Sequence, residues 1–242
     1  FQLDHQNILG NTIEEIAKEK AGIVKENITI ISGDENPVVK EIIKQKAFEV
    51  KADYIDATGI KTDLVSDLKG NYQKKNIRVV LALVNELRNQ AINISNDDVK
   101  SGLLNVHQNT NFIGRWFEFS KDPLTICDTG HNHAGLEEVF KQLNEYAQSK
   151  HIILGFVNDK KIDDVIPMLP SEAQFYFVKP SVGRGRHPED YDDLLKKFKL
   201  NYKIFDSIQE GYVAAKQNCK KEEMIFIGGS NFVVGDFLEK NL

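Results

Sequence analysis

The chain has 242 residues, of which 41% are hydrophobic, and its 31 basic and 36 acidic side chains give a formal net charge of −5. This length suits one large or two ordinary domains with a substantial buried core. A weakly acidic chain without blocks of Lys and Arg argues against nonspecific nucleic-acid binding, and no apolar run is long enough to span a membrane. We therefore expect small-molecule partners, no nucleic-acid partner and no membrane partner.

The cysteine content and the first residue lead to two further expectations. Only Cys127 and Cys219 are present, which suits a reducing compartment, and we predict a cytoplasmic protein. The sequence starts at Phe1, without Met, inside a strand-like run. We therefore expect that an upstream segment is missing.

The first half of the chain mixes helix and strand signals. Apolar periodicity and cap residues predict, in chain order, a helix over 13–21 capped at Asn11-Thr12, a strand over 27–32, helices over 37–48 and 71–89, and a helix that begins after Ser95. The last two helices are expected to form a hairpin. A polar stretch follows, and we place the domain boundary at residues 119–123, so that residues 1–119 and 120–242 form separate domains.

Past Pro123, strands alternate regularly with helices. This rhythm predicts strands over 124–127, 151–156, 174–178 and 224–227, and helices over 136–147, 162–168 and 188–198. The alternation is typical of an α/β fold with an open, doubly wound parallel sheet. Ligands of such a sheet gather at the carboxyl ends of its strands.

Asp4-His5 and Glu19-Lys20 form the first candidate constellation. A neutral His5 imidazole could bind a metal ion, and the charge of Lys20 could pair with an oxyanion. The alternative is that Glu19-Lys20 belongs to an ordinary solvated helix face.

Residues 128–133, Asp-Thr-Gly-His-Asn-His, form the second constellation, where a strand ends and a helix begins. Carboxylates and imidazoles at that position point toward the ligand crevice of the sheet, and Gly130 permits a close turn. The string also suggests a metal site, although no further cluster completes one. The alternatives are a helix cap formed by Asn132 and a solvent-facing His133.

Arginines form the third group of candidates. Gly114-Arg115 lies near the expected domain boundary, where the guanidinium could reach a phosphate. Arg184 and Arg186 lie in a basic loop after a strand, which indicates either anion contact or a flexible surface turn.

Over almost its whole length the chain resembles the bifunctional folylpolyglutamate synthase/dihydrofolate synthase family of the Mur ligase superfamily. Residues 3–25 are similar to the family's most recognisable signature, and Asp128 to Asn132 to its Asp-Gly-Ala-His-Asn element. Three further elements match: Gln73 to Asn76, Gly114-Arg115 and Gly228-Gly229-Ser230. Before Gly114, Phe112-Ile113 stands where the family has Trp-Pro. All the elements occur in the same order as in the family.

The resemblance implies a fold and a reaction. Residues 1–119 would be the rear part of a central ATPase domain, and 120–242 a Rossmann-like C-terminal domain. ATP would phosphorylate a carboxylate of dihydropteroate or a reduced folate, and the amine of L-glutamate would then displace phosphate from the acyl phosphate. The family's phosphate loop is not in this sequence, so we expect a fragment that is inactive without the upstream segment, and a monomer at full length.

The resemblance also assigns roles to individual residues. Magnesium would be held by His5 and by a carbamylated Lys20, whose carbamate oxygens suit Mg²⁺ where an ammonium does not. Lys20 and His131 would be catalytic. The nucleotide-binding residues would be Asn76, Arg115, Asp128, His131 and Ser230.

Three alternatives remain open. One is a different Mur-type ligase that adds an amino acid to a peptidoglycan precursor. Another is a non-catalytic nucleotide-binding or interaction module. The third is a metal hydrolase that uses Asp128, His131 and His133.

Overall fold

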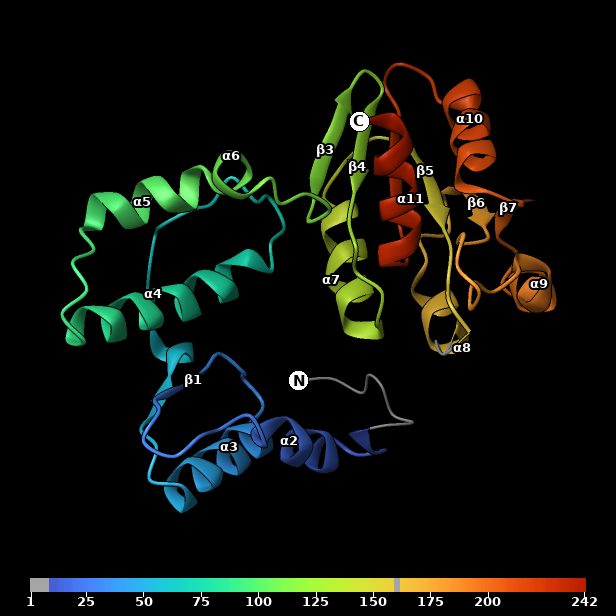
Figure 1. Cartoon of the computed structure of the whole chain (residues 1–242). Helices are drawn as coiled ribbons and strands as arrows, with labels where there is room; N and C mark the ends of the chain where they lie inside the picture. Colours follow the sequence, from blue (N-terminus) through green and yellow to red (C-terminus); the bar gives the residue numbers. More distant parts are fainter. Residues whose placement is uncertain (1–8, 159–161) are drawn as a thin grey trace. The chain divides into compact units, whose positions relative to one another are not determined.

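The computed structural model describes residues 9–158 and 162–242, and the chain divides into two compact units (Figure 1). The first unit comprises the residues up to Asp67 together with Tyr72–Asn111, and the second comprises Leu68–Asn71 together with Phe112–Leu242. Within the described ranges, no helix is both long and apolar enough to cross a membrane.

The first unit opens with a small parallel sheet and its helices. Its elements are α2 (Ile13–Ala21), β1 (Ile30–Ser32), α3 (Pro37–Glu49), β2 (Tyr54–Asp56) and the 3-10 helix η1 (Ala57–Gly59). The predicted cap of α2 is confirmed, because Thr12 accepts a hydrogen bond from the Glu15 N–H while the Glu15 carboxylate accepts one from the Thr12 N–H. The core of this part joins Ala17 to Val39 and Ile43.

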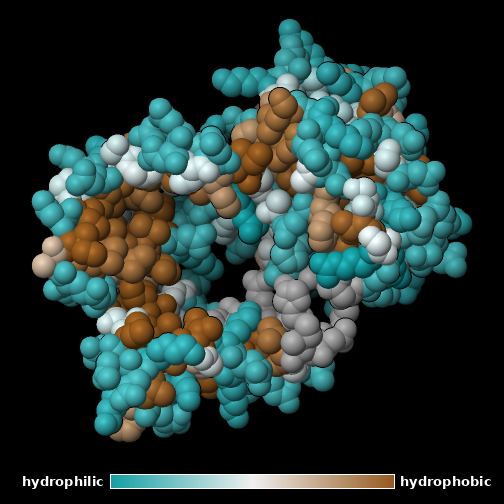
Figure 2. Space-filling model, viewed as in Figure 1, coloured by the Kyte–Doolittle hydropathy of each residue, from teal (hydrophilic) through white to brown (hydrophobic). Residues whose placement is uncertain are grey.

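The predicted helical hairpin is confirmed as α4 (Gln73–Asn89) and α5 (Asn96–Leu104), which the short helix α6 (Val106–Thr110) follows. Ile77 packs against Val99 and Leu103 between α4 and α5. Figure 2 shows apolar surface over this hairpin, which carries partly exposed aliphatic side chains such as Leu83 and Leu104.

The second unit is built on a six-stranded sheet with the order β3-β4-β8-β5-β6-β7. Its strands are β3 (Phe117–Lys121), β4 (Leu124–Cys127), β5 (Lys150–Leu154), β6 (Gln174–Val178), β7 (Asn201–Phe205) and β8 (Met224–Gly228). All neighbouring strands are parallel except β3 and β4. The expected doubly wound parallel sheet is confirmed, with one antiparallel strand at its edge, because the short turn between β3 and β4 forces the chain to reverse.

The expected domain boundary at residues 119–123 falls within and just after β3, whereas the contacts divide the chain near Asn111. The physical reason is that β3 pairs with β4 and so belongs to the sheet of the second unit. The segment 68–71 also lies on the second unit. Gln142 holds it there, because its amide donates to the Lys69 carbonyl at 2.9 Å and accepts from the Asn71 N–H at 2.7 Å.

Helices cover both faces of the sheet, as expected for a doubly wound fold. One face packs against α7 (His133–Leu143), α8 (Ile162–Val165), η2 (Ile166–Met168), η3 (Pro188–Tyr191) and α9 (Asp192–Lys197). The other packs against α10 (Ile208–Asn218) and α11 (Asn231–Asn241). β8 shows the alternation, since Phe226 enters the first core and its neighbours Ile225 and Ile227 enter the second.

The neighbouring strands β4 and β8 are followed by helices on opposite faces, α7 after β4 and α11 after β8. Neighbouring strands whose connections leave in opposite directions form the switch point where α/β sheets bind ligands. We therefore expect ligand-binding residues just past Cys127 and Gly228.

Gly155, just past β5, lies where the backbone comes close to residues of β6 and α11. A Cβ on Gly155 would lie 2.5 Å from the Val178 carbonyl oxygen and 2.7 Å from a Val233 methyl carbon. Gly155→Ala is therefore expected to lower the free energy of unfolding by about 1–3 kcal/mol, as overpacking does. Urea denaturation followed by the fluorescence of Trp116, the single tryptophan, measures the effect in this unit.

Gly183→Ala is the matched control, because a Cβ at Gly183 would meet no atom within 4 Å. The control should change the free energy of unfolding by less than about 0.5 kcal/mol. Equal losses in the two variants would contradict the close approach at Gly155.

Candidate functional site

The backbones that follow β4, β8 and β5 converge at the carboxyl edge of the sheet. The Asp128 N–H donates to the Ile227 carbonyl at 3.0 Å, which extends the β4–β8 pairing by one step. Gly229 has a φ of +87°, and a Cβ there would lie 3.0 Å from the Gly155 carbonyl oxygen. Only glycine accommodates this turn and this close approach without strain.

The carboxylate of Asp128 is the centre of this edge. Its side chain is almost fully buried, and one oxygen accepts from the Gly130 N–H at 2.7 Å while the other accepts from the Trp116 N–H at 2.9 Å. The Thr129 N–H donates to the Gly114 carbonyl at 2.9 Å. Asp128 therefore ties residues 114–116 to the end of β4.

The hydrogen bonds that join residues 114–116 to the end of β4 also fix the position of Arg115. It lies between Gly114, with a φ of +89°, and Trp116, with a φ of +48°. Trp116 is buried, and its ring centroid is 6.1 Å from that of Tyr146 and 6.3 Å from that of Phe226. The half-buried Arg115 is thus held beside the turn after β4 by an anchored neighbour on each side.

Cys127 precedes Asp128 and is fully buried. Burial, together with the negative charge of Asp128, raises the pKa of the Cys127 thiol well above its usual range. The thiol therefore stays protonated and packs as a small apolar side chain.

His131 lies half-buried in the turn that leads into α7. Its Nδ1 is 3.0 Å from the Thr129 carbonyl oxygen, and because a carbonyl only accepts, Nδ1 carries the hydrogen. This tautomer leaves Nε2 as the ring nitrogen that can accept a proton. The two alternatives weighed for this string are confirmed, since Asn132 caps α7 by accepting from the Gly135 N–H and His133 is exposed.

Ser230 caps α11 at the end of β8. Its buried hydroxyl accepts from the Phe232 N–H at 3.0 Å. The Arg184 guanidinium lies over the Phe232 ring, 5.1 Å from its centroid, and so comes to the first turn of α11. Sequence reasoning left Arg184 unassigned; its position after the carboxyl end of β6 is the signal that could have placed it at this edge.

The basic loop that carries Arg184 is paired with the chain that follows β5. The Asn158 N–H donates to the Arg184 carbonyl and the Arg186 N–H donates to the Phe156 carbonyl, both at 2.9 Å. Arg186 also lies over the Tyr191 ring. These pairings favour an ordered element over the flexible turn considered from the sequence.

The remaining predicted residues belong to the first unit. Lys20 is half-buried in the last turn of α2. Asn76 is exposed in the first turn of α4, where its amide donates to the Gln73 side chain at 2.7 Å. The predicted ligand His5 lies outside the described residues. The structure thus brings together Arg115, Asp128, His131 and Ser230 within one unit.

The metal-hydrolase alternative finds no support in the described part of the chain. There, Asp128, His131 and His133 do not form a group of three converging ligands. The reason is that the Asp128 oxygens face backbone N–H groups and the His133 side chain is exposed.

Comparisons with known proteins show which proteins this chain is similar to. The chain is 26% identical over 270 residues to the dihydrofolate synthase/folylpolyglutamate synthase of Bacillus subtilis, covering 98% of this chain and 60% of that protein. The chain spans about three fifths of the length of the curated relatives it matches.

Solved structures share the fold. The Mycobacterium tuberculosis folylpolyglutamate synthase complexed with ADP and AMPPCP superposes with a TM-score of 0.85 at 19% identity, covering 99% of this chain and 62% of that one. The Yersinia pestis bifunctional enzyme complexed with AMPPNP and a Mn ion superposes with a TM-score of 0.77 at 20% identity, covering 99% of this chain and 59% of that one.

A family match covers the edge described above. Residues 114–231, from Gly114 beside Arg115 to the first residue of α11, match the glutamate ligase domain of the Mur ligases. This part of the chain is therefore similar to the C-terminal domain of Mur ligases, within a chain that is similar over most of its length to folylpolyglutamate and dihydrofolate synthases.

Proposed function

We propose that this protein acts in folate metabolism as an ATP-dependent ligase that joins L-glutamate to dihydropteroate, to reduced folates or to both. The carboxylate of the acceptor would be activated as an acyl phosphate, and the amine of glutamate would displace phosphate to form the amide. The observation that carries the proposal is the buried Asp128 carboxylate, which holds Arg115 and the His131 turn together at the switch point of the sheet.

The residues at this edge suit a polyanionic ligand. Arg115 supplies a guanidinium fork for phosphate oxygens, and His131 can donate or accept a proton at Nε2. The turns into α7 and α11 present the positive ends of two helix dipoles to the same edge. We assign Arg115, His131 and Ser230 to nucleotide contact. Asp128 would act mainly by positioning Arg115 and the His131 turn, and Asn76 would contact the nucleotide from α4.

Magnesium fits the proposed reaction, and the donor chemistry restricts how it is held. Mg²⁺ prefers oxygen ligands, which an unmodified Lys20 does not offer and a Lys20 carbamate does. His5 and carbamylated Lys20 would hold the ion, which would offset phosphate charge during transfer. The two free cysteines suit a cytoplasmic enzyme, and we propose a monomer at full length.

A second candidate is a Mur-type ligase that adds an amino acid to a peptidoglycan precursor. It rests on the family match, which is to the glutamate ligase domain of Mur ligases in general. A nucleotide-binding module without catalysis would share the same edge but would form no amide.

One assay separates these candidates. The native polypeptide that carries this sequence is incubated with ATP, Mg²⁺, L-glutamate and either dihydropteroate or a reduced folate. We expect phosphate release, and a product heavier by one glutamate, only when all substrates are present. Product formed only when a peptidoglycan precursor replaces the folate substrate would favour the second candidate. Nucleotide binding without any product would favour the non-catalytic module.

His131→Ala is expected to lower kcat about 100-fold, the size of effect seen when one group that contacts the transition state is removed. His133→Ala is the matched control, because His133 lies exposed two residues further on and should leave kcat within about twofold. Steady-state phosphate release measures both variants. A similar loss in both would show that general damage to the α7 turn, rather than a role of His131, explains the effect.

Lys20→Gln is expected to abolish Mg²⁺-dependent ligation, because an amide nitrogen cannot form a carbamate. Lys18→Gln, an exposed position on the same helix, is the control and should keep full activity. Mass spectrometry of a gently handled Lys20 peptide at mildly alkaline pH with bicarbonate should show the added mass of one carbon dioxide. An unmodified peptide, or activity that survives Lys20→Gln, argues against the carbamate.

A further inference from the structure

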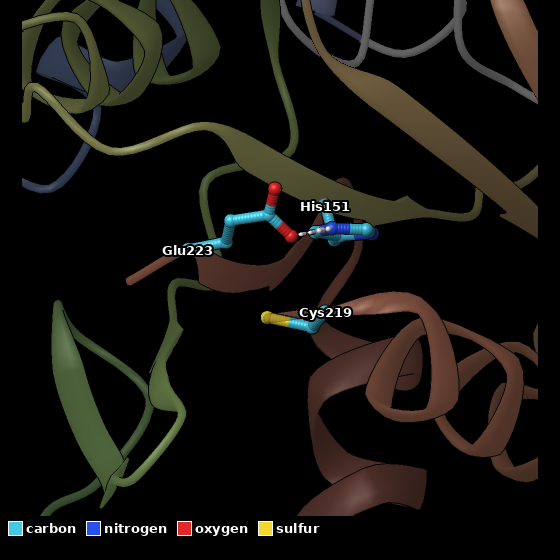
Figure 3. Close-up of side chains that lie close together, drawn as sticks. All are labelled: His151, Cys219 and Glu223. Atoms are coloured by element: carbon cyan, nitrogen blue, oxygen red, sulfur yellow. Dashed lines mark hydrogen bonds and ion pairs between the residues drawn. The ribbon is translucent and has the colours of Figure 1, made fainter. Parts of the chain in front are cut away.

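His151, Cys219 and Glu223 gather at the amino-terminal edge of the sheet, opposite the edge that carries Asp128 (Figure 3). His151 is the second residue of β5, Glu223 comes just before β8, and Cys219 is the cap residue that ends α10. They meet because β5 and β8 are hydrogen-bonded neighbours, with His151 opposite Ile225. Their candidate ligand atoms all lie within 4.8 Å of one another.

His151 and Glu223 are paired with each other. The His151 Nε2 is 3.0 Å from the Glu223 Oε2, and its Nδ1 is 2.9 Å from the Tyr176 hydroxyl. Glu223 Oε2 also accepts from the Lys220 N–H at 2.8 Å. These hydrogen bonds alone could explain why His151 and Glu223 lie together, since both stabilise the fold. They do not explain why the Cys219 thiol lies beside them.

The Cys219 thiol has only a weak contact of its own. Its Sγ is 3.5 Å from the Lys220 carbonyl oxygen, and the side chain is partly exposed. Burial and the nearby Glu223 carboxylate raise the pKa of the thiol to about 11. Cys219 is therefore not poised as a nucleophile, because a nucleophilic cysteine needs a lowered pKa.

We propose that His151, Cys219 and Glu223 bind a zinc-type divalent transition-metal ion through the imidazole Nε2, the thiolate and a carboxylate oxygen. One nitrogen, one sulfur and one oxygen ligand, with water in the fourth position, make a donor set that zinc accepts and that magnesium does not. The thiol proton passes to solvent, and the two negative ligands balance the charge of the ion.

Tyr176 supplies the outer contact that such a site needs. When Nε2 binds the metal, the neutral imidazole carries its hydrogen on Nδ1 and donates it to the Tyr176 hydroxyl. A ligating histidine usually donates its other N–H to an acceptor of this kind, which fixes the orientation of the ring. The contact between Nδ1 and Tyr176 is already present, but its direction reverses when the ion binds. Without an ion, Nε2–H donates to the Glu223 carboxylate and Nδ1 of the neutral ring accepts from the Tyr176 O–H.

The site needs only a small adjustment to close. Zinc bonds of about 2.0–2.3 Å in a tetrahedral arrangement place neighbouring ligand atoms about 3.5 Å apart, so a separation of up to 4.8 Å must shrink by at most about 1.3 Å. Cys219 can provide this movement, because its backbone has left the helix with ψ at 122°. Cys219 and Glu223 are both partly exposed, which leaves a route for the ion from solvent.

Cobalt is the probe that tests the proposal. The metal-stripped protein is titrated with Co²⁺, and the near-ultraviolet absorption that arises only from thiolate-bound cobalt is followed. We expect this band to develop with one equivalent of cobalt and to disappear when Zn²⁺ is added. The proposed magnesium site at His5 and Lys20 contains no sulfur and cannot produce the band, so this test and that of the ligase function fail independently.

Variants assign the band to this cluster. Cys219→Ser should abolish it, and Tyr176→Phe should weaken cobalt binding about 10-fold. Glu222→Gln is the matched control, because it removes a neighbouring exposed carboxylate outside the cluster and should leave the band unchanged. Far-ultraviolet circular dichroism and Trp116 fluorescence verify that each variant is folded. Absence of the band in the unmodified protein, or its persistence in folded Cys219→Ser, would overturn the proposal.

Discussion

The buried carboxylate of Asp128 is the interaction on which the arrangement of the second unit depends. Burying an ionised carboxylate is costly, and here hydrogen bonds from the Trp116 and Gly130 N–H groups offset that cost. The Gly130 N–H lies in the turn that follows β4, and the Trp116 N–H lies in the segment that leads into β3. A single charge therefore holds the left-handed backbone of Trp116 in place and sets the tip of β4.

The regular parts of the fold were predictable because their residues report burial directly. β4 and β6 lie at the expected residues, since continuous apolar runs between polar ends mark strands buried on both faces. β7 was missed because it is an edge strand in which polar residues interrupt the apolar ones, so no continuous apolar run marks it. β2 was missed because three residues are too few to show a period.

Candidate site residues were predictable where they lie within one short segment. The turn from Asp128 to His131 could be located from the chain alone, but not that its carboxylate points inward to backbone N–H groups. The sequence offered Arg184 as a candidate but not its contact with Phe232, and the trio of His151, Cys219 and Glu223 escaped, because these partners lie far apart in sequence. Only the pairing of β8 with β5 brings that trio together, and no local pattern encodes a strand order.

The position of β8 has a consequence for how the protein is made. β4 and β5 do not pair with each other; β8 lies between them, and it follows β5, β6 and β7 in the chain. During synthesis, β4 and β5 therefore lack their shared neighbour until β8 has been made. Until then, their apolar faces and unpaired edges are open to water and to other chains. Insertion of β8 closes both long-range pairings together, so the nascent second unit matures in one late step rather than strand by strand.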